Sequence, residues 1–301
     1  MESVVSSKRI YPKGDGPLIP RTENRRAVDE ASSAGMQACW TCGSCDFECP
    51  VNIYTRTLRP QKIVRMANLG LLDELLWLPE IWYCISCRRC GHVCPNVVKP
   101  WAMIEYARRA AIFKKYVSWE SVQHMQRLWM YFQKIRWHAV AVCIQGGEIE
   151  TLLDGQVEAW LNQEDYLSDA VIRQGVGQLY PDTLKLLNKS CSTTHCYTCS
   201  ECSSACPISG NKRLFDPSAI VRMVNLGMVT ELLNTPAIWL CLGCRRCSDC
   251  CSQGVDGASL IQDLRDLALS SGAVDFELKI RMENSFRVVY QYFLREIRQI
   301  L

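Results

Sequence analysis

The sequence lacks long hydrophobic runs, an excess of charge of either sign, and the alternating pattern of β-strands. Its uninterrupted apolar stretches, such as residues 139–144, are far shorter than the ~18–20 residues that span a bilayer. Lys and Arg total 34 against 31 Asp and Glu in 301 residues, and a formal charge of +3 gives no broad basic surface of the kind that binds nucleic acid. We therefore expect a helical protein with no membrane span and no nucleic-acid partner.

An export signal is also missing. Residues 1–26 mix charge, proline and glycine and contain no apolar segment of the ~7–15 residues found in secretory signals. We therefore expect a cytoplasmic protein and leave peripheral attachment to a membrane complex open. Against these absences stand 19 cysteines. Because cytosolic thiols stay reduced, so many cysteines indicate metal binding rather than disulfides.

The chain is an internal duplication. An offset of 157 residues superimposes residues 39–98 on 196–255 without a gap and gives 28 identities in 60 positions. The identities include the non-cysteine segments IVRM, NLG and IW, which cysteine composition alone does not produce. Beyond residue 98 the match fades to pairs such as Arg108 with Arg265. We expect the two copies to share one fold.

Proline and glycine mark helix ends at the same places in both copies. Asp216 is a candidate N-cap before Pro217, and Gly227 follows the helix, which is the usual order at helix termini. The first copy repeats the pattern with Pro60 and Gly70. Further helices are expected at residues 71–77 and 228–234 and within the amphipathic stretches 101–137 and 258–301.

The duplication predicts a mainly α fold with two tandem domains. The predicted division is an N-terminal arm at 1–34, a first domain with a helical extension at 35–143, a connecting segment at 144–190, and a second domain with a C-terminal helix at 191–301.

Sixteen cysteines fall into four runs with the spacing C-x2-C-x2-C-x3-C, namely CWTCGSCDFECP, CISCRRCGHVCP, CYTCSECSSACP and CLGCRRCSDCCS. In two-cluster ferredoxins with this spacing, three close cysteines bind one [4Fe-4S] cluster and the fourth binds the other cluster. Each copy is therefore predicted to be an α-helical ferredoxin-like domain with two clusters. The predicted ligand sets are Cys39, Cys42, Cys45 and Cys94 for cluster 1; Cys84, Cys87, Cys90 and Cys49 for cluster 2; Cys196, Cys199, Cys202 and Cys251 for cluster 3; and Cys241, Cys244, Cys247 and Cys206 for cluster 4.

Structural zinc also takes four thiolates, but its cysteines normally come in two separated pairs, so iron–sulfur clusters are the preferred interpretation. Three cysteines have no assigned cluster. For Cys143 and Cys191 the default is a small buried thiol. Cys250 differs because it precedes Cys251, after which Ser252 replaces the proline of the other three runs. An unusual cluster, if the protein has one, is expected there.

Two arginine pairs, Arg88–Arg89 and Arg245–Arg246, lie between ligands of the second run in each copy. One interpretation is a solvated pair that offsets cluster charge. The other is a docking patch for an acidic partner, or a charge that raises the cluster potential. The sequence leaves both interpretations open.

The segments between the runs resemble the C subunit of heterodisulfide reductase. LRPQKIVRMANLGLLDELLWLPEIWYC at 58–84 and FDPSAIVRMVNLGMVTELLNTPAIWLC at 215–241 share its order of an IVR helix, N-L-G, a short helix and I-W-x-C before the second run. The resemblance covers about 39–110 and 196–267. Proteins of this family are similar to the α-helical ferredoxin domain of succinate dehydrogenase and fumarate reductase iron–sulfur subunits.

The resemblance implies an electron-transfer subunit of an oxidoreductase complex in anaerobic metabolism. Its implied partners in a hetero-oligomer are a flavin-containing, iron–sulfur protein like the A subunit of heterodisulfide reductase and a catalytic protein like the B subunit, with cysteine-rich CCG domains. The chain departs from the family in having two copies where the usual subunit has one. It contains no CCG repeat, no flavin fingerprint and no G-x-G-x-x-G, so we expect no catalytic residue in it.

Several alternatives stay open on the sequence alone. The chain could instead carry a substrate-binding or atypical cluster near Cys250 and Cys251, serve as the iron–sulfur subunit of a quinone-linked dehydrogenase complex, or be a metal-stabilised scaffold without a redox role. The two copies could act in series, or at pseudosymmetric positions with one partner each. The gap-free duplication favours the second arrangement because it preserves both surfaces.

Overall fold

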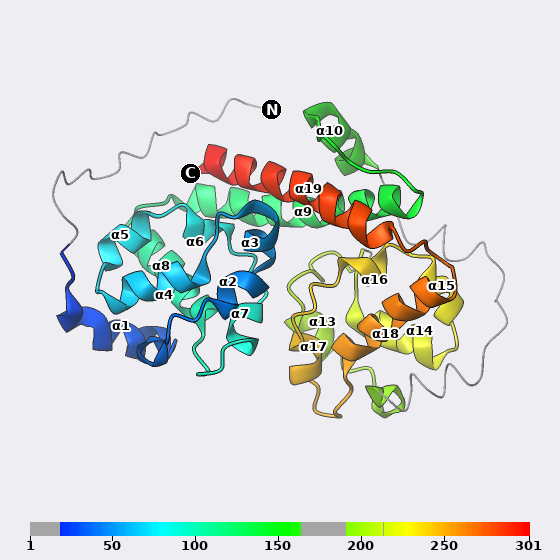
Figure 1. Ribbon diagram of the computed structural model, residues 1–301, viewed down its shortest axis with the longest axis horizontal. Coiled ribbons are helices and arrows are strands. Elements are labelled where there is room, and N and C mark those ends of the chain that lie inside the picture. Colours follow the sequence, from blue (N-terminus) through cyan, green and yellow to red (C-terminus); the bar gives the residue numbers. More distant parts are fainter. Residues whose placement is uncertain (1–18, 164–190, 213) are drawn as a thin grey trace. The chain divides into compact units, whose positions relative to one another are not determined.

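The computed structural model describes residues 19–163, 191–212 and 214–301, and every regular element in them is a helix (Figure 1). This confirms the mainly α prediction. None of the helices in these ranges is both long and apolar enough to cross a bilayer. Most of the predicted N-terminal arm and of the connecting segment falls outside the described residues.

Seven helices of the first copy have counterparts 157 residues later in the second, whereas the described residues 207–212 form no helix equivalent to that at Pro50–Thr55. The helices of the first copy are η1 (Thr22–Asn24), α1 (Arg25–Ser32), η2 (Met36–Ala38), α2 (Ser44–Glu48), α3 (Pro50–Thr55), α4 (Pro60–Asn68), α5 (Leu72–Trp77), α6 (Glu80–Tyr83), α7 (Arg89–His92) and α8 (Pro100–Phe113). In the second copy they are η3 (Thr193–His195), α13 (Glu201–Ala205), α14 (Pro217–Asn225), α15 (Val229–Leu233), α16 (Ala237–Leu240), α17 (Arg246–Asp249) and α18 (Gly257–Ser270). The remaining helices are α9 (Trp119–Ile144), α10 (Asp154–Asn162) and α19 (Leu278–Ile300).

Residue contacts divide the chain into two compact units. One comprises residues 1–129 together with 290–301, and the other comprises residues 130–289. Each unit contains the two cysteine runs of one copy, and α9 and α19 each contribute residues to both units. The boundaries at 143 and 190, which follow the duplication, stay a prediction.

The helical cores of the two units use equivalent positions. In the first unit α4 packs against α5 and α8, and in the second α14 packs against α15 and α18. Five pairs of apolar side chains separated by 157 residues are buried in both units: Ile63 and Ile220, Val64 and Val221, Leu75 and Leu232, Leu76 and Leu233, and Ile104 and Ile261. The last pair shows that the equivalence continues past the region of strong sequence identity.

The N-L-G segment connects each core to the first cysteine run. The Asn68 side chain donates from Nδ2 to the Met36 carbonyl oxygen at 2.8 Å, and Asn225 repeats the bond to Thr193 at 2.9 Å. Gly70 has a φ of +70°, and a Cβ there would lie 1.8 Å from the Arg21 carbonyl oxygen. A side chain at position 70 is therefore excluded, and the turn after α4 requires glycine.

The N-terminus of the helix after the first run is capped differently in the two copies. Asp216 accepts from the Ser218 amide at 2.9 Å, which confirms its predicted role as N-cap. In the first copy the N-cap position holds Arg59, and Asp46 caps instead by accepting from the Gln61 amide at 2.7 Å. Asp46 also accepts from Arg59 Nε at 3.1 Å. The capping carboxylate has therefore moved to the residue after a predicted cluster ligand.

Replacing Asp46 with alanine is expected to weaken α4 selectively. The change removes the cap and the ion pair with Arg59, and losing a cap costs about 1–2 kcal/mol. Hydrogen–deuterium exchange should show faster exchange in residues 60–68 and unchanged protection in 217–225. The matched control is Ser203→Ala at the equivalent position, which removes the hydrogen bond that Ser203 donates to Asp216 but keeps the capping carboxylate and its bond to the Ser218 amide. Equal effects of the two substitutions on their own helices would contradict the assigned cap.

Candidate metal centres

The four cysteine runs adopt one backbone conformation. The residue two positions after the first cysteine lies in the left-handed region in every run, and so does the residue directly after the second cysteine. Most of these residues are not glycine, so the left-handed conformation is held by the surrounding loop rather than by intrinsic preference. The first group comprises Thr41 (φ 57°), Ser86 (54°), Thr198 (62°) and Gly243 (64°), and the second comprises Gly43 (84°), Arg88 (66°), Ser200 (63°) and Arg245 (59°).

The second left-handed residue of each run begins a short helix. It is the N-cap of α2, α7, α13 or α17, and the third cysteine of the run lies within that helix. The helices are paired within each copy, because α2 packs against α7 and α13 packs against α17. In three of the four runs the fourth cysteine, Cys49, Cys206 or Cys251, lies close to the other run of its copy, as the exchange of ligands between runs requires.

Backbone amides are directed at the first cysteine in three of the runs. The amides of Thr41, Ser86 and Gly243 donate to the sulfur two residues earlier, each at 3.4 Å. Hydrogen bonds from amides stabilise a thiolate and tune the potential of a cluster bound to it. The left-handed conformation of these three residues thus directs their amides at the sulfur of the first cysteine.

One cavity in the second unit contains all the predicted ligands of cluster 4. It encloses about 320 Å³, with open solvent at its mouth included, and Cys206, Cys241, Cys244 and Cys247 line it. Its other walls are mainly apolar, including Ile208, Phe215 and Ile261.

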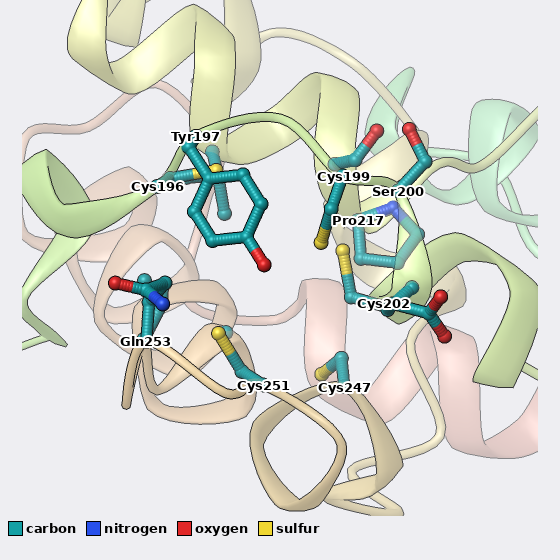
Figure 2. A pocket seen from close by; sticks show the side chains of 14 residues that line it. Cys196, Tyr197, Cys199, Ser200, Cys202, Pro217, Cys247, Cys251 and Gln253 are labelled. Atoms are coloured by element: carbon teal, nitrogen blue, oxygen red, sulfur yellow. The ribbon is translucent and has the colours of Figure 1, made fainter.

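A second cavity contains the predicted ligands of cluster 3. Cys196, Cys199, Cys202 and Cys251 line a space of about 480 Å³, again counting its open mouth. Figure 2 shows the sulfur atoms of Cys199, Cys202 and Cys251 directed into this space beside the ring of Tyr197.

In the first unit, the predicted ligands of cluster 2 lie close enough to one another to affect each other's pKa values. Burial raises the pKa of Cys49, and charges on Cys84 and Cys87 raise it further. The pKa of Cys90 is raised by burial and then by the charges of Cys84, Cys87 and Cys49. For cluster 1, burial raises the pKa of Cys45 to about 12, with contributions from Asp46, Cys39 and Cys42.

The donor set fits [4Fe-4S] clusters. Among the described residues, no three His, Cys, Asp or Glu side chains converge closely enough to hold a single metal ion. In the second unit the thiols instead surround hollows with largely apolar walls, which suits a multinuclear group bound by sulfur and shielded from water. The sixteen cysteines would supply the thiolates, and a cluster bound there would exchange single electrons. The assignment of individual ligands stays a prediction.

Three of the arginines in the paired motifs have partners inside their own unit. The guanidinium of Arg88 lies 4.0 Å from the ring centroid of Trp101. Arg89 donates from Nε to Glu48 at 2.7 Å, and Arg245 donates to Asp256 at 3.0 Å. Glu48 becomes Ala205 in the second copy, so the surroundings of the two pairs have diverged.

The three cysteines without an assigned cluster lie in different environments. Cys143 is buried and donates to the Ser285 hydroxyl at 3.3 Å, and Cys191 is buried beside the Asp263 carboxylate at 3.5 Å. Cys250 is half-buried at the end of α17, and its Sγ lies 3.5 Å from the Cys247 carbonyl oxygen. Charges on Cys251 and Cys199 contribute to its raised pKa after burial, which places its thiol near cluster 3.

Two further residues at the centres were not predicted from the sequence. Arg108 donates from Nε to the Ile81 carbonyl oxygen at 2.7 Å and from Nη2 to the Cys84 carbonyl oxygen. Arg265 makes the same pair of bonds in the second copy, to Ile238 at 2.8 Å and Cys241 at 2.7 Å. The internal alignment pairs these two arginines, but the sequence does not indicate which carbonyl groups they bond.

Two sequence families, each described as a 4Fe-4S dicluster domain, match the chain at residues 38–99 and 192–255. Curated relatives include the iron–sulfur C subunit of the CoB–CoM heterodisulfide reductase of Methanopyrus kandleri, 36% identical over 90 residues, which are 30% of this chain and 46% of the relative. The C subunit of the H2:CoB–CoM heterodisulfide, ferredoxin reductase of Methanothermobacter thermautotrophicus is 34% identical over 84 residues, or 28% and 45% of the two chains. A protein of Archaeoglobus profundus, described as similar to the C subunit of heterodisulfide reductase, is 28% identical over 104 residues, or 35% and 55%.

The chain spans about half the length of these curated relatives. The two family matches coincide with the two copies found by the internal alignment, and each includes both cysteine runs of its copy. The chain therefore carries two 4Fe-4S dicluster domains in tandem, which imply four [4Fe-4S] clusters, and it is similar to the C subunits of heterodisulfide reductases.

Proposed function

We propose that the protein is the electron-transfer subunit of a heterodisulfide reductase-like complex. Electrons pass through its four clusters between two partners: a flavin- and cluster-bearing protein like the A subunit of heterodisulfide reductase, and a CCG-domain protein like the B subunit. The observation that carries the proposal is the presence, in both copies, of two cysteine loops with equivalent backbone conformations, and cysteines of both runs line each of two cavities in the second copy. The chain's similarity to the C subunits supports the identity of the complex.

Burial of the ligands supports a direction for the path within each copy. We call clusters 1 and 3 the outer clusters, because each has one exposed ligand, Cys42 or Cys199. We call clusters 2 and 4 the inner clusters, because at least two of the four predicted ligands of each are buried and none is exposed. The buried ligands of the inner clusters are Cys49, Cys87 and Cys90 in the first copy and Cys244 and Cys247 in the second. An outer cluster is thus the one closer to a docked partner.

Exposed apolar side chains support a similar partner at each copy. Three pairs of large apolar residues separated by 157 positions are exposed in both units: Trp40 and Tyr197, Leu69 and Leu226, and Trp119 and Phe276. Trp40 and Tyr197 each follow the first ligand of an outer cluster. This repetition favours the pseudosymmetric arrangement over a single path in series. The first copy also exposes Phe47 and Val97, and the second copy has Ser204 and Gly254 at the equivalent positions, so the two surfaces are not identical.

The experiment that tests the proposal is anaerobic purification followed by a redox titration. The loaded protein should contain about 16 iron and 16 sulfide ions, since each cluster has four of both, and should be reduced in one-electron steps visible by electron paramagnetic resonance. Mixing it with the flavin-bearing and CCG-domain partners should then link flavin oxidation to disulfide reduction. A loaded chain that these partners neither reduce nor oxidise would contradict the assignment to this complex.

A second candidate function is a substrate-binding or atypical cluster beside Cys250, favoured by the position of that thiol near Cys199 and Cys251. Under the electron-transfer proposal, Cys250→Ser should change neither iron content nor turnover of the complex. If Cys250 belongs to a substrate site, turnover should fall while iron content stays near normal. Val93 occupies the equivalent position in the first copy, so Val93→Ser is the matched control.

A further inference from the structure

Arg108 on α8 and Arg265 on α18 each bond to the backbone of a predicted ligand of an inner cluster. Each arginine lies on α8 or α18 and bridges two carbonyl groups, one on the preceding short helix and one on the first ligand of the second run, Cys84 or Cys241. Arg108 also donates from Nη1 to the Ser86 hydroxyl at 3.4 Å. The guanidinium therefore fixes the cysteine backbone from which the ligand sulfur extends.

An aromatic ring covers each of these guanidinium groups. Arg108 lies 5.8 Å from the ring centroid of Trp82, and Arg265 lies 5.7 Å from that of Trp239. Both rings are buried. An aromatic face stabilises a cation, and an arginine keeps its charge in proteins. Carbonyl groups are neutral, so these bonds do not neutralise the guanidinium charge beside the inner cluster, and at Arg108 the nearby Glu105 carboxylate opposes part of it.

The outer clusters have charges of the opposite sign nearby. The Asp46 carboxylate directly follows Cys45, the third ligand of cluster 1, and accepts from Arg59 Nε at 3.1 Å. In the second copy Ser203, which directly follows Cys202, donates to the Asp216 carboxylate. A negative charge disfavours adding an electron to a cluster, and a positive charge favours it, most strongly where water is excluded. Both copies thus place an acid beside the outer cluster and an arginine beside the inner cluster.

We propose that Arg108 and Arg265 are positioning residues that fix the first ligand of clusters 2 and 4 and raise the reduction potentials of these inner clusters above those of clusters 1 and 3. This inference rests on the proposed electron-transfer function. With clusters bound, this difference in potential would favour transfer of one electron from the outer cluster, which would be oxidised, to the inner cluster, which would be reduced.

The test is a redox titration of the loaded full-length protein, followed by electron paramagnetic resonance. Arg108→Gln removes the charge and should lower one of the four reduction steps by about tenfold in its equilibrium constant, equivalent to ~59 mV for one electron. Arg265→Gln should lower a different step by a similar factor. Arg109→Gln is the matched control, because Arg109 is the next residue on α8, carries the same charge and is exposed.

If Arg108→Gln does not bind its cluster, Arg108→Lys distinguishes the effect of the positive charge from the effect of the guanidinium hydrogen bonds on the cysteine loop. Lysine keeps the charge but not the forked geometry, so a loaded lysine variant should have a potential near that of the wild type. A potential lowered as far as in Arg265→Gln would contradict the assignment to charge. Equal shifts in Arg109→Gln and Arg108→Gln, or no shift in either loaded glutamine variant, would overturn the inference. A wild-type chain without four reducible clusters would instead overturn the proposed function.

Discussion

Replacing Cys87 with alanine is expected to remove one cluster and to lower the iron content from about 16 to about 12 atoms per chain. Cys87 is a buried ligand of the predicted cluster 2. Without it only three thiolates remain to bind the cluster, and we expect the cluster to be lost. Iron and sulfide analysis of the anaerobically purified variant measures the loss. Cys143→Ala is the control, because this buried thiol lies apart from the runs and should leave all four clusters in place.

Double substitutions extend this prediction to the exchange of ligands between runs. Cys49 lies in the first run but is predicted to bind the same cluster as Cys87, so Cys49→Ala combined with Cys87→Ala should remove no more iron than either change alone. Cys45→Ala combined with Cys87→Ala should remove about eight atoms, because these two cysteines belong to different predicted sets. Loss of two clusters from the Cys49 and Cys87 combination would show that the fourth cysteine binds within its own run.

The second large effect is a pH dependence that differs in sign between the cluster-free and the loaded protein. Without clusters, burial raises the pKa of Cys45 to about 12 and those of Cys202 and Cys244 to about 11, from an ordinary value of 9.0. A raised pKa in the folded state stabilises the fold below the unfolded pKa, and this stabilisation is lost as pH rises through the folded pKa. The cluster-free protein should therefore lose stability between about pH 9 and pH 12.

In the loaded protein the same cysteines are thiolates, so loading releases protons and acid pH opposes it. Iron retention is expected to fall as pH decreases from about 8 to about 5, while the helical signal of the cluster-free protein stays constant over this range. Iron analysis after desalting and circular dichroism measure the two effects. Cys143→Ala should not alter the iron profile. Retention that is independent of pH, or that improves in acid, would contradict thiolate binding.

The two copies differ in charged residues near their cysteine runs. The ion pair between Glu48 and Arg89 has no equivalent in the second copy, because Ala205 replaces the glutamate, and the capping carboxylate changes from Asp46 to Asp216. The buried apolar pairs and the carbonyl-bridging arginines of α8 and α18 are retained. Both copies therefore retain the residues that position the cysteine loops, whereas the capping acid comes from a different position in each copy.

The sequence by itself determined the duplication, the helical class and the cluster type. These depend on local patterns: the spacing of cysteines within a run, the periodicity of apolar residues, and proline and glycine at helix ends. The N-cap at Asp216 was predicted correctly for the same reason, because a cap interacts with amides only two or three residues away. Even the equivalence of Ile104 and Ile261, weak in the alignment, appears as equal burial in the two units.

Tertiary structure alone decided which side chains reach the loops from distant parts of the chain. Arg108 bonds a carbonyl 24 residues away, and Asp46 caps a helix 15 residues further along the chain, and no local pattern encodes either distance. The arginine pairs also acquired partners, such as Trp101 and Asp256, that spacing could not identify. Local interactions are fixed by neighbours in the sequence, whereas these contacts depend on how helices pack, and packing brings together residues whose separation in the chain carries no signal.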